Sequence, residues 1–256
     1  MNTGILARIV GHKRAELAGA SRNRAELERR AASRMPARDF RAAITTNQPA
    51  IIAEIKKASP SRGVLMETFD PPSIARAYAS GGAAALSVLT DREFFLGSLA
   101  DLESARAAVA IPTLRKDFTI DEFHVIEAAA YGADAILLIA AVLDEKELRR
   151  FRELAAKFRM AALVEIHNAG ELDAALASGA EIVGVNNRDL NTFEVKLETS
   201  LRLIERIPAS VVKVSESGIH SNADIQRLAA AGFHAFLVGE HLMKSPDPAA
   251  ALRALR

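Results

Sequence analysis

The chain has 256 residues, of which half are hydrophobic and a quarter are charged. This length lies near the upper limit of one hydrophobic core, and the composition is that of a globular protein rather than a disordered or fibrous one. Lysine plus arginine exceed aspartate plus glutamate by only one, so no overall positive field would attract nucleic acid, although the first 41 residues are locally basic. The composition therefore indicates one globular domain spanning residues 1–256.

Two further classes of protein are disfavoured by features that the sequence lacks. Without cysteine, the chain can form neither a disulfide framework nor a thiol nucleophile. Its first residues lack the apolar core of a signal peptide, and the apolar stretch 133–142 contains an aspartate and is too short to span a bilayer. We therefore expect a cytoplasmic protein that binds neither membrane nor nucleic acid. A monomer is expected, with an oligomer left open.

The first 48 residues are predicted to form a helical extension. Ile5, Ile9, Lys13 and Leu17 recur at helical spacing, and the later stretch rich in alanine, arginine and glutamate is typical of a solvated helix. The extension could cover the bottom of the domain or contribute residues to a substrate site. Its basic character favours an ordinary solvated helical face.

Eight short apolar runs follow, separated by longer segments with helical periodicity. We predict strands at residues 51–56, 85–89, 111–116, 134–139, 160–165, 182–186, 211–216 and 235–239. The alternation is typical of repeated βα units, and a doubly wound sheet rarely needs eight strands. The predicted fold class is therefore α/β, a (β/α)₈ or TIM barrel over residues 49–256 with an N-terminal helical extension.

The segments between the runs carry signals of helix ends. Capping patterns begin three predicted helices, at Asp144 with Glu147, Asn168 with Glu171, and Ser221 with Asp224. A glycine ends every second predicted helix at intervals of 50, 47 and 53 residues, namely Gly82, Gly132, Gly179 and Gly232. This spacing indicates four similar quarters of two βα units each.

Charged residues end several of the predicted strands, where barrel enzymes carry their catalytic groups. These residues are Glu54, Lys56, Lys116, Glu165 and Glu216. Alternate residues of a strand share a face, so Glu54 and Lys56 point the same way. Because close opposite charges and burial tune the pKa of each group, lysines beside carboxylates suit proton transfer on an anionic substrate.

Neither a metal nor another cofactor is expected at these strand ends. Glu165 and His167 lie two residues apart and could share a metal, but no third ligand stands at a recognisable spacing. His167 is more simply a residue of the following loop.

Two glycine-containing pairs follow the last two predicted strands, Ser217–Gly218 and Gly239–Glu240. Barrel enzymes commonly bind phosphate there, through backbone amides of the loops and a helix N-terminus. The pairs therefore predict a phosphorylated small molecule as the substrate.

Five segments of the chain resemble the indole-3-glycerol phosphate synthase family, in the family's order and approximate spacing. They are residues 54–61, 114–118, 164–167, 184–190 and 215–219, and the resemblance extends over essentially the whole chain, including the first helix and the long extension. The resemblance implies a barrel enzyme of tryptophan biosynthesis, a carboxy-lyase. Its reaction closes, decarboxylates and dehydrates 1-(2-carboxyphenylamino)-1-deoxyribulose 5-phosphate to indole-3-glycerol phosphate.

The resemblance also implies roles for the charged residues. Lys116 would be the general acid that protonates the ketone oxygen, and Glu165 the base that removes a proton during dehydration. Lys56 would hold the substrate carboxylate. Glu54 and Glu216 would orient these groups and tune their charge.

Further residues would bind the substrate. Asn186 and Arg188 would bind polar groups, Ser59 lies in the first of the matching segments, and Phe95 and Phe118 would enclose the anthranilate ring.

The phosphate is assigned to the loops that carry Ser217, Gly218, Gly239 and Glu240. A carboxylate facing phosphate would repel it. We therefore expect the Gly239 and Glu240 amides to bind the anion while the Glu240 side chain points away.

Three alternatives remain open from the sequence. Another phosphate-binding barrel, such as phosphoribosylanthranilate isomerase, is disfavoured by the run at 54–61. An aldolase forming a Schiff base on Lys116 needs that lysine deprotonated. A barrel that binds nucleic acid or a partner through the basic extension leaves the charged strand ends unexplained.

Overall fold

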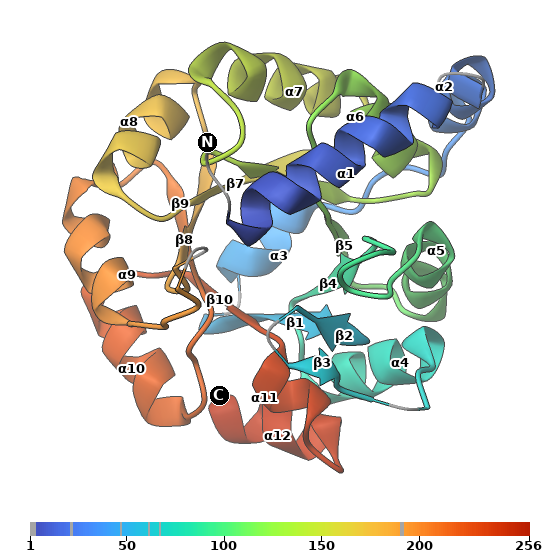
Figure 1. Cartoon of the computed structure of the whole chain (residues 1–256). Helices are drawn as coiled ribbons and strands as arrows, with labels where there is room; N and C mark the ends of the chain where they lie inside the picture. The colour runs from blue at the N-terminus through green and yellow to red at the C-terminus, as the bar shows by residue number, and fades with distance from the viewer. Residues whose placement is uncertain (1–3, 21–22, 47, 61, 67, 190–191) are drawn as a thin grey trace.

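The computed structural model describes residues 4–20, 23–46, 48–60, 62–66, 68–189 and 192–256. The final residue of two motif segments, 61 and 190, lies outside these ranges. Eight parallel strands close into a barrel in the order β1-β10-β9-β8-β7-β6-β5-β4, and helices surround it (Figure 1). The predicted TIM barrel is confirmed.

The barrel strands follow the predicted runs to within two residues at each end. Their bounds are β1 Ala50–Ile55, β4 Ala85–Leu89, β5 Thr113–Lys116, β6 Ala135–Ile139, β7 Ala161–Ile166, β8 Ile182–Asn186, β9 Val212–Glu216 and β10 Ala235–Val238. The largest difference is the start of β5, which begins just after Pro112 because proline has no amide hydrogen for the ladder. A small antiparallel pair that was not predicted, β2 (Ala58–Ser59) with β3 (Gly63–Val64), follows β1.

The helices lie outside the barrel, and several of them begin or end at the predicted capping residues and glycines. Their bounds are α4 Pro71–Gly81, α5 Leu99–Ala108, α6 Glu122–Ala130, α7 Glu145–Lys157, α8 Ala169–Ala177, α9 Glu198–Leu203, the 3₁₀ helix η2 Ile204–Arg206, α10 Asn222–Ala231, α11 Glu240–Met243 and α12 Pro248–Leu255. The three predicted capping residues Asp144, Asn168 and Ser221 each accept a backbone hydrogen bond from the third residue of their helix. All four repeat glycines have positive φ, as expected of glycines that follow helix ends.

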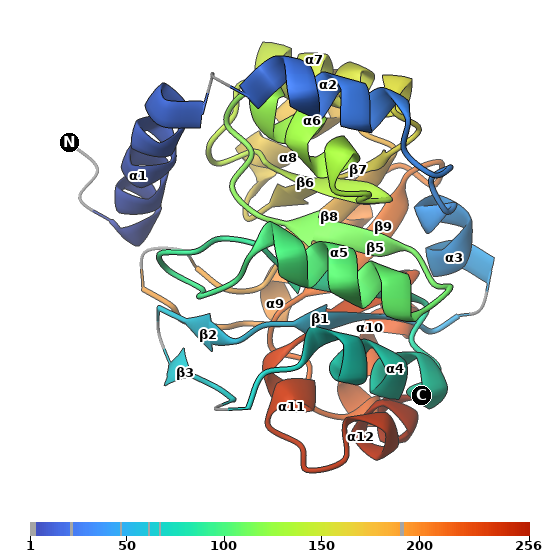
Figure 2. The ribbon, with the colours of Figure 1, turned by 90° about the vertical axis from the view of Figure 1, so that its right-hand side faces the viewer.

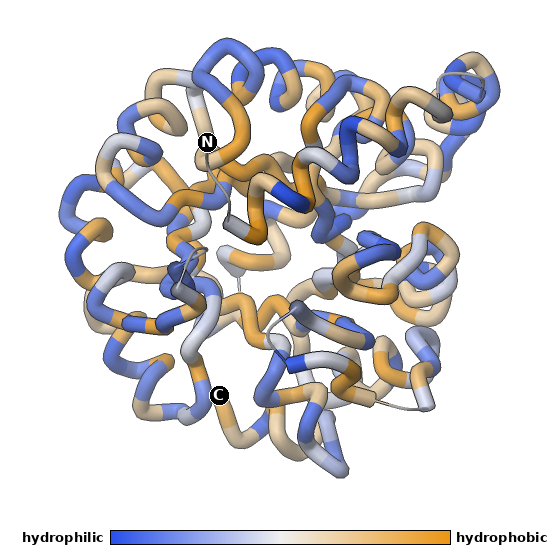
Figure 3. Tube along the Cα trace, viewed as in Figure 1, coloured by the Kyte–Doolittle hydropathy of each residue, from blue (hydrophilic) through white to orange (hydrophobic). Residues whose placement is uncertain are grey.

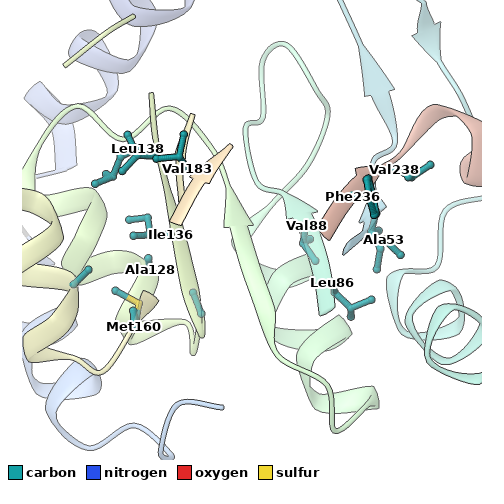
Figure 4. Packing of buried hydrophobic residues seen from close by; sticks show 14 of the residues in the cluster. Ala53, Leu86, Val88, Ala128, Ile136, Leu138, Met160, Val183, Phe236 and Val238 are labelled. Carbon is teal, nitrogen blue, oxygen red and sulfur yellow. The ribbon is translucent and has the colours of Figure 1, made fainter. Parts of the chain in front are cut away.

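Alternation along the strands separates two hydrophobic clusters. In Figure 3 the inner strands are mainly hydrophobic, whereas the helices carry hydrophilic residues on their outer surfaces. Outward-facing strand residues such as Ile136, Leu138 and Val183 pack beneath the helices in the larger cluster (Figure 4). Inward-facing residues such as Ile52 and Leu163 fill the barrel itself. Each fully buried side chain of this size contributes about 1.5–3 kcal/mol to folding, so the barrel interior is a packed core.

The N-terminal extension contacts both ends of the barrel. It comprises α1 (Ile5–Ala20), α2 (Arg24–Ala32) and α3 (Phe40–Thr46). In Figure 2, α1 lies on the same side of the barrel as β2 and β3, and α3 lies on the opposite side. Phe40 and Ile44 of α3 belong to the inner cluster and close the bottom of the barrel. None of the helices in the described part of the chain is long and apolar enough to cross a membrane.

Asp134, just before β6, joins the extension to the barrel. Its carboxylate is fully buried and accepts hydrogen bonds from the amides of Arg38 and Thr113, both at 2.9 Å. The guanidinium of Arg106 lies 3.0 Å from the same carboxylate. One buried anion thus connects the linker before α3 to two neighbouring strands.

We expect Asp134→Ala to lower the free energy of unfolding by about 3 kcal/mol, because it leaves the half-buried Arg106 guanidinium and two amides without their acceptor. The matched control is Asp173→Ala, which removes an exposed ion pair with Arg206 and should cost less than about 1 kcal/mol. Urea unfolding followed by circular dichroism measures both. Equal losses in the two variants would contradict the proposed link.

Candidate active site

The inward positions of the strands change from apolar to charged or polar at their carboxyl ends. Inward-facing Ile52, Leu114, Leu163 and Val214 belong to the inner hydrophobic cluster. Two residues later, on the same face of each strand, stand Glu54, Lys116, Glu165 and Glu216. The barrel therefore brings these four side chains together, although more than 160 residues separate the first from the last.

Lys116 lies between two carboxylates. Its Nζ is 3.0 Å from Glu165 Oε2 and 3.7 Å from Glu216 Oε2. Burial alone would lower the pKa of the Lys116 ammonium, but the neighbouring carboxyl groups, that of Glu165 first, outweigh it and raise that pKa above its usual range. Lys116 therefore carries a proton at neutral pH.

The two carboxyls beside Lys116 differ in protonation. Burial would raise the pKa of Glu165, but Lys116 and His167 outweigh it and lower that pKa to about 2. Burial and the neighbouring Glu165 carboxylate raise the pKa of Glu216 to about 8. The site thus holds an ionised Glu165 and a largely neutral Glu216 side by side at neutral pH, because one ammonium cannot compensate two buried carboxylates.

Two glycines make room for the carboxylates. A Cβ at Gly184 would collide with the carboxylate of Glu216, which leans over β8 from the neighbouring strand. A Cβ at Gly239 would likewise collide with the carboxylate of Glu54. Any larger residue at either position would displace a charged group of the site.

Lys56 lies just beyond the end of β1. Its Nζ is 2.6 Å from Glu54 Oε1, so the two residues share a side of the chain as predicted. Its side chain remains partly exposed. The carboxylate of Glu54 therefore fixes an accessible ammonium at the mouth of the barrel.

One cavity of about 360 Å³ lies over these groups, within the range typical of small-molecule sites. Its lining includes every residue that the sequence singled out as catalytic, substrate-binding or phosphate-binding: Glu54, Lys56, Ser59, Phe95, Lys116, Phe118, Glu165, Asn186, Arg188, Glu216, Ser217, Gly218, Gly239 and Glu240. The structure therefore brings all of them together around one space, while their individual roles stay predictions.

The aromatic and amide residues lie on different walls of this cavity. The rings of Phe95 and Phe118 are 6.2 Å apart between centroids and tilted by 37°. On β8, Asn186 Oδ1 accepts a hydrogen bond from the amide of Arg188 at 3.0 Å, and the Asn186 side chain also bonds to Glu165 and helps to lower its pKa.

The loops after β9 and β10 carry the predicted phosphate-binding residues. Ser217 and Gly218 both have positive φ, at 68° and 78°. The Glu240 carboxylate lies 2.6 Å from the ammonium of Lys244, 3.3 Å from the guanidinium of Arg62 and 3.8 Å from that of Arg188. Burial raises the pKa of Glu240, but Lys244, Arg62 and Lys56 outweigh it and lower that pKa, so the carboxylate is ionised and compensated.

Several contributors to the site were not identified from the sequence. Ile5, Leu6 and Ile9 of α1 line the cavity, so the extension supplies part of its wall. His167, assigned to the loop, follows β7 as expected, but its Nε2 is 3.5 Å from Glu165 Oε1 and its Nδ1 is 3.1 Å from Glu171 Oε2. The helical spacing of the first residues was a usable signal for the extension, and the two-residue spacing of Glu165 and His167 was a usable signal for their contact.

Within the described ranges, no cluster of three or more histidine, cysteine, aspartate or glutamate side chains is arranged to hold a metal ion.

Comparisons with known proteins agree on one family. A family model described as indole-3-glycerol phosphate synthase matches residues 6–255. Proteins named indole-3-glycerol phosphate synthase from Albidiferax ferrireducens and Aromatoleum aromaticum are each 50% identical to this chain, over 259 and 257 residues. The matches cover 99% and 98% of this chain, and 98% of each relative.

Solved structures of other proteins share the fold. The N-acetylmannosamine-6-phosphate 2-epimerase from Clostridium perfringens has a TM-score of 0.63 at 16% identity, covering 82% of this chain and 93% of its own. KGPDC from Streptococcus mutans has a TM-score of 0.62 at 13% identity, covering 82% and 96%. At such identities the likeness concerns the fold alone. The family model and the curated relatives together show that this chain belongs to the indole-3-glycerol phosphate synthase family.

Proposed function

We propose that this chain converts 1-(2-carboxyphenylamino)-1-deoxyribulose 5-phosphate to indole-3-glycerol phosphate, a step of tryptophan biosynthesis. The observation that carries the proposal is the ion pair of Lys116 with the buried Glu165, 3.0 Å apart in the lining of the cavity. A protonated ammonium beside an ionised carboxylate supplies both the donor and the acceptor that ring closure followed by dehydration requires.

In the first step, the ring carbon that bears the carboxylate attacks the ketone carbon, and Lys116 donates a proton to the ketone oxygen. The C–C bond forms as the carbonyl π electrons move to oxygen, which becomes a hydroxyl. The carboxylate then leaves as carbon dioxide, and its bonding electrons restore the aromatic ring. Lys56, held by Glu54, binds this carboxylate before it leaves.

Dehydration completes the indole. Glu165 accepts a proton from the methylene carbon next to nitrogen, and the hydroxyl leaves as water after protonation by a lysine ammonium. Glu216, largely neutral at neutral pH, positions Lys116 without competing for its charge. His167 supports an ionised Glu165 from the other side.

The remaining residues of the cavity would bind the substrate. Phe95 and Phe118 would enclose the anthranilate ring, while Asn186, Arg188 and Ser59 would bind its polar groups. Their place in the cavity lining supports this assignment.

The phosphate would be bound by the loops of Ser217, Gly218, Gly239 and Glu240, through backbone amides. The cations around the Glu240 carboxylate support this assignment, because they offset a charge that would otherwise repel the phosphate. We further propose that the chain is one domain and acts as a cytoplasmic monomer.

The alternatives fit the site less well. The raised pKa of Lys116 keeps it protonated, whereas a Schiff-base aldolase needs a free amine. A nucleic-acid-binding barrel gives no reason for a buried proton donor beside a buried acceptor.

The reaction itself is tested by adding the carboxyphenylamino substrate and following the fluorescence of the indole product. The chain contains no tryptophan, so product is the only indole in the sample. We expect turnover by the wild type. Folded protein that forms no product would refute the proposed function.

The roles of the central pair are tested by Lys116→Met and Glu165→Gln. Each should lower kcat by about two orders of magnitude or more while the fold is kept, as loss of a general acid or base does. Lys157→Met and Glu153→Gln, both exposed on α7, are the matched controls and should retain wild-type rates. Near-normal turnover in both site variants would overturn the assignment.

The raised pKa of Glu216 predicts a pH-dependent stability. The folded state keeps the Glu216 proton up to about pH 8, whereas an unfolded glutamate loses it near pH 4.3. The stabilisation is therefore complete below about pH 4.3 and is lost as pH rises to about 8, by at most about 1.4 kcal/mol per pH unit.

Urea unfolding of the wild type and Glu216→Gln at several pH values in this window measures the effect. The amide cannot titrate, so the wild type should lose stability relative to the variant as pH rises. If the free energy of unfolding changed equally with pH in the two proteins, the pKa of Glu216 would not be raised in the folded state, which would contradict the prediction.

A further inference from the structure

The N-terminal helix carries a buried cation whose side chain faces the barrel. Ile5, Ile9 and Lys13 lie on one face of α1, at successive four-residue steps. The two isoleucines line the cavity, and Lys13 is only 5% exposed. A lysine so deeply buried requires anionic partners, because burying an unpaired ammonium is costly.

Lys13 has two buried partners, and they lie at the ends of neighbouring strands. Its Nζ is 2.9 Å from Asp91 Oδ2, after β4, and 3.1 Å from Asp117 Oδ1, after β5. A third carboxylate, Glu16 of α1 itself, lies at 3.1 Å. Lys13 is therefore a bridge between the extension and the rim of the barrel.

Both aspartates also hold the backbone of the cavity's aromatic wall. Asp91 Oδ1 accepts hydrogen bonds from the amides of Phe94 and Phe95, at 2.7 and 3.2 Å. Asp117 Oδ1 accepts one from the amide of Phe118 at 2.8 Å. One ammonium thus connects the two carboxylates that fix the main chain of both aromatic side chains.

We infer that Lys13 is a positioning residue for the aromatic end of the substrate. It holds Asp91 and Asp117 in place, and through them it fixes the separation and tilt of Phe95 and Phe118. The inference rests on the proposed function, because the aromatic wall binds a ring only if the substrate carries one.

The charge of Lys13 also matches its surroundings. Burial would lower the pKa of Lys13, but Asp117 and Asp91 outweigh it and raise that pKa, so the residue is cationic. Burial raises the pKa of Asp117, but Arg115 and Lys13 outweigh it and hold it well below the usual range. Buried ion pairs add little to stability compared with apolar packing. We therefore assign Lys13 the role of fixing the geometry of Asp91 and Asp117 rather than that of stabilising the fold.

The first test is Lys13→Met, which keeps the length and helix propensity of the side chain and removes its charge. Arg14→Met, at the neighbouring exposed position of α1, is the matched control. Amide hydrogen exchange at Phe94, Phe95 and Phe118 should become at least about tenfold faster in Lys13→Met and stay unchanged in Arg14→Met. Unchanged exchange in Lys13→Met would overturn the inference, whether or not the protein has the proposed activity.

The second test separates the two ends of the substrate. An N-alkylanthranilate and ribulose 5-phosphate serve as competitive inhibitors of turnover, and anthranilate fluorescence is readable because the chain lacks tryptophan. In Lys13→Met, the inhibition constant of the N-alkylanthranilate should rise about tenfold, whereas that of ribulose 5-phosphate should stay within about twofold of the wild-type value. The variant should raise KM by a larger factor than it lowers kcat. Equal weakening of both inhibitors would indicate a general structural role and overturn the inference.

A third variant keeps the inference testable if Lys13→Met folds poorly. Asp91→Asn preserves the oxygen that accepts the amide hydrogen bonds and removes the charge that Lys13 pairs with. It should weaken anthranilate binding without affecting ribulose 5-phosphate, because it breaks the same contact as Lys13→Met. Unchanged anthranilate binding in Asp91→Asn would refute action through Asp91. A wild type without turnover but with the expected exchange differences would refute only the proposed function.

Discussion

One geometrical constraint underlies the whole site: in a closed parallel barrel every second side chain of a strand points inward, and all strands end at the same rim. The inward positions are apolar through the depth of the barrel, and only the last inward position of these strands is charged. Lys116, Glu165 and Glu216 therefore meet at the top of a packed core. Their backbone positions are set by strand pairing rather than by mobile loops, which is what precise proton transfer needs.

Burial sets the protonation states of these three side chains. In water, a lysine and two glutamates would all be ionised at neutral pH and interact weakly. In the site, desolvation makes each charge energetically costly. The favoured state at neutral pH has Lys116 protonated, Glu165 ionised and Glu216 largely neutral. A protonated ammonium and an ionised carboxylate thus lie in contact, and the third group carries no second negative charge.

The extension contributes to opposite ends of the barrel by different interactions. At the bottom, Phe40 and Ile44 of α3 fill the barrel by hydrophobic packing. At the rim, α1 places apolar residues on the cavity wall and one buried lysine against two aspartates. The contact at the bottom stabilises the fold. At the rim, Lys13 pairs with Asp91 and Asp117, the aspartates that accept hydrogen bonds from the amides of Phe95 and Phe118.

Sequence alone determined the strands, the helix caps at Asp144 and Ser221, and the inward face that ends in charge, because each is a local pattern of a few residues. Only the tertiary structure decided what those residues meet. The space that Gly184 leaves for Glu216, the ion pair of Lys116 with Glu165, and the place of α1 on the cavity wall depend on segments far apart in the chain. Periodicity reports which face of an element is buried, but the partner on that face is set by closure of the barrel, which no local pattern encodes.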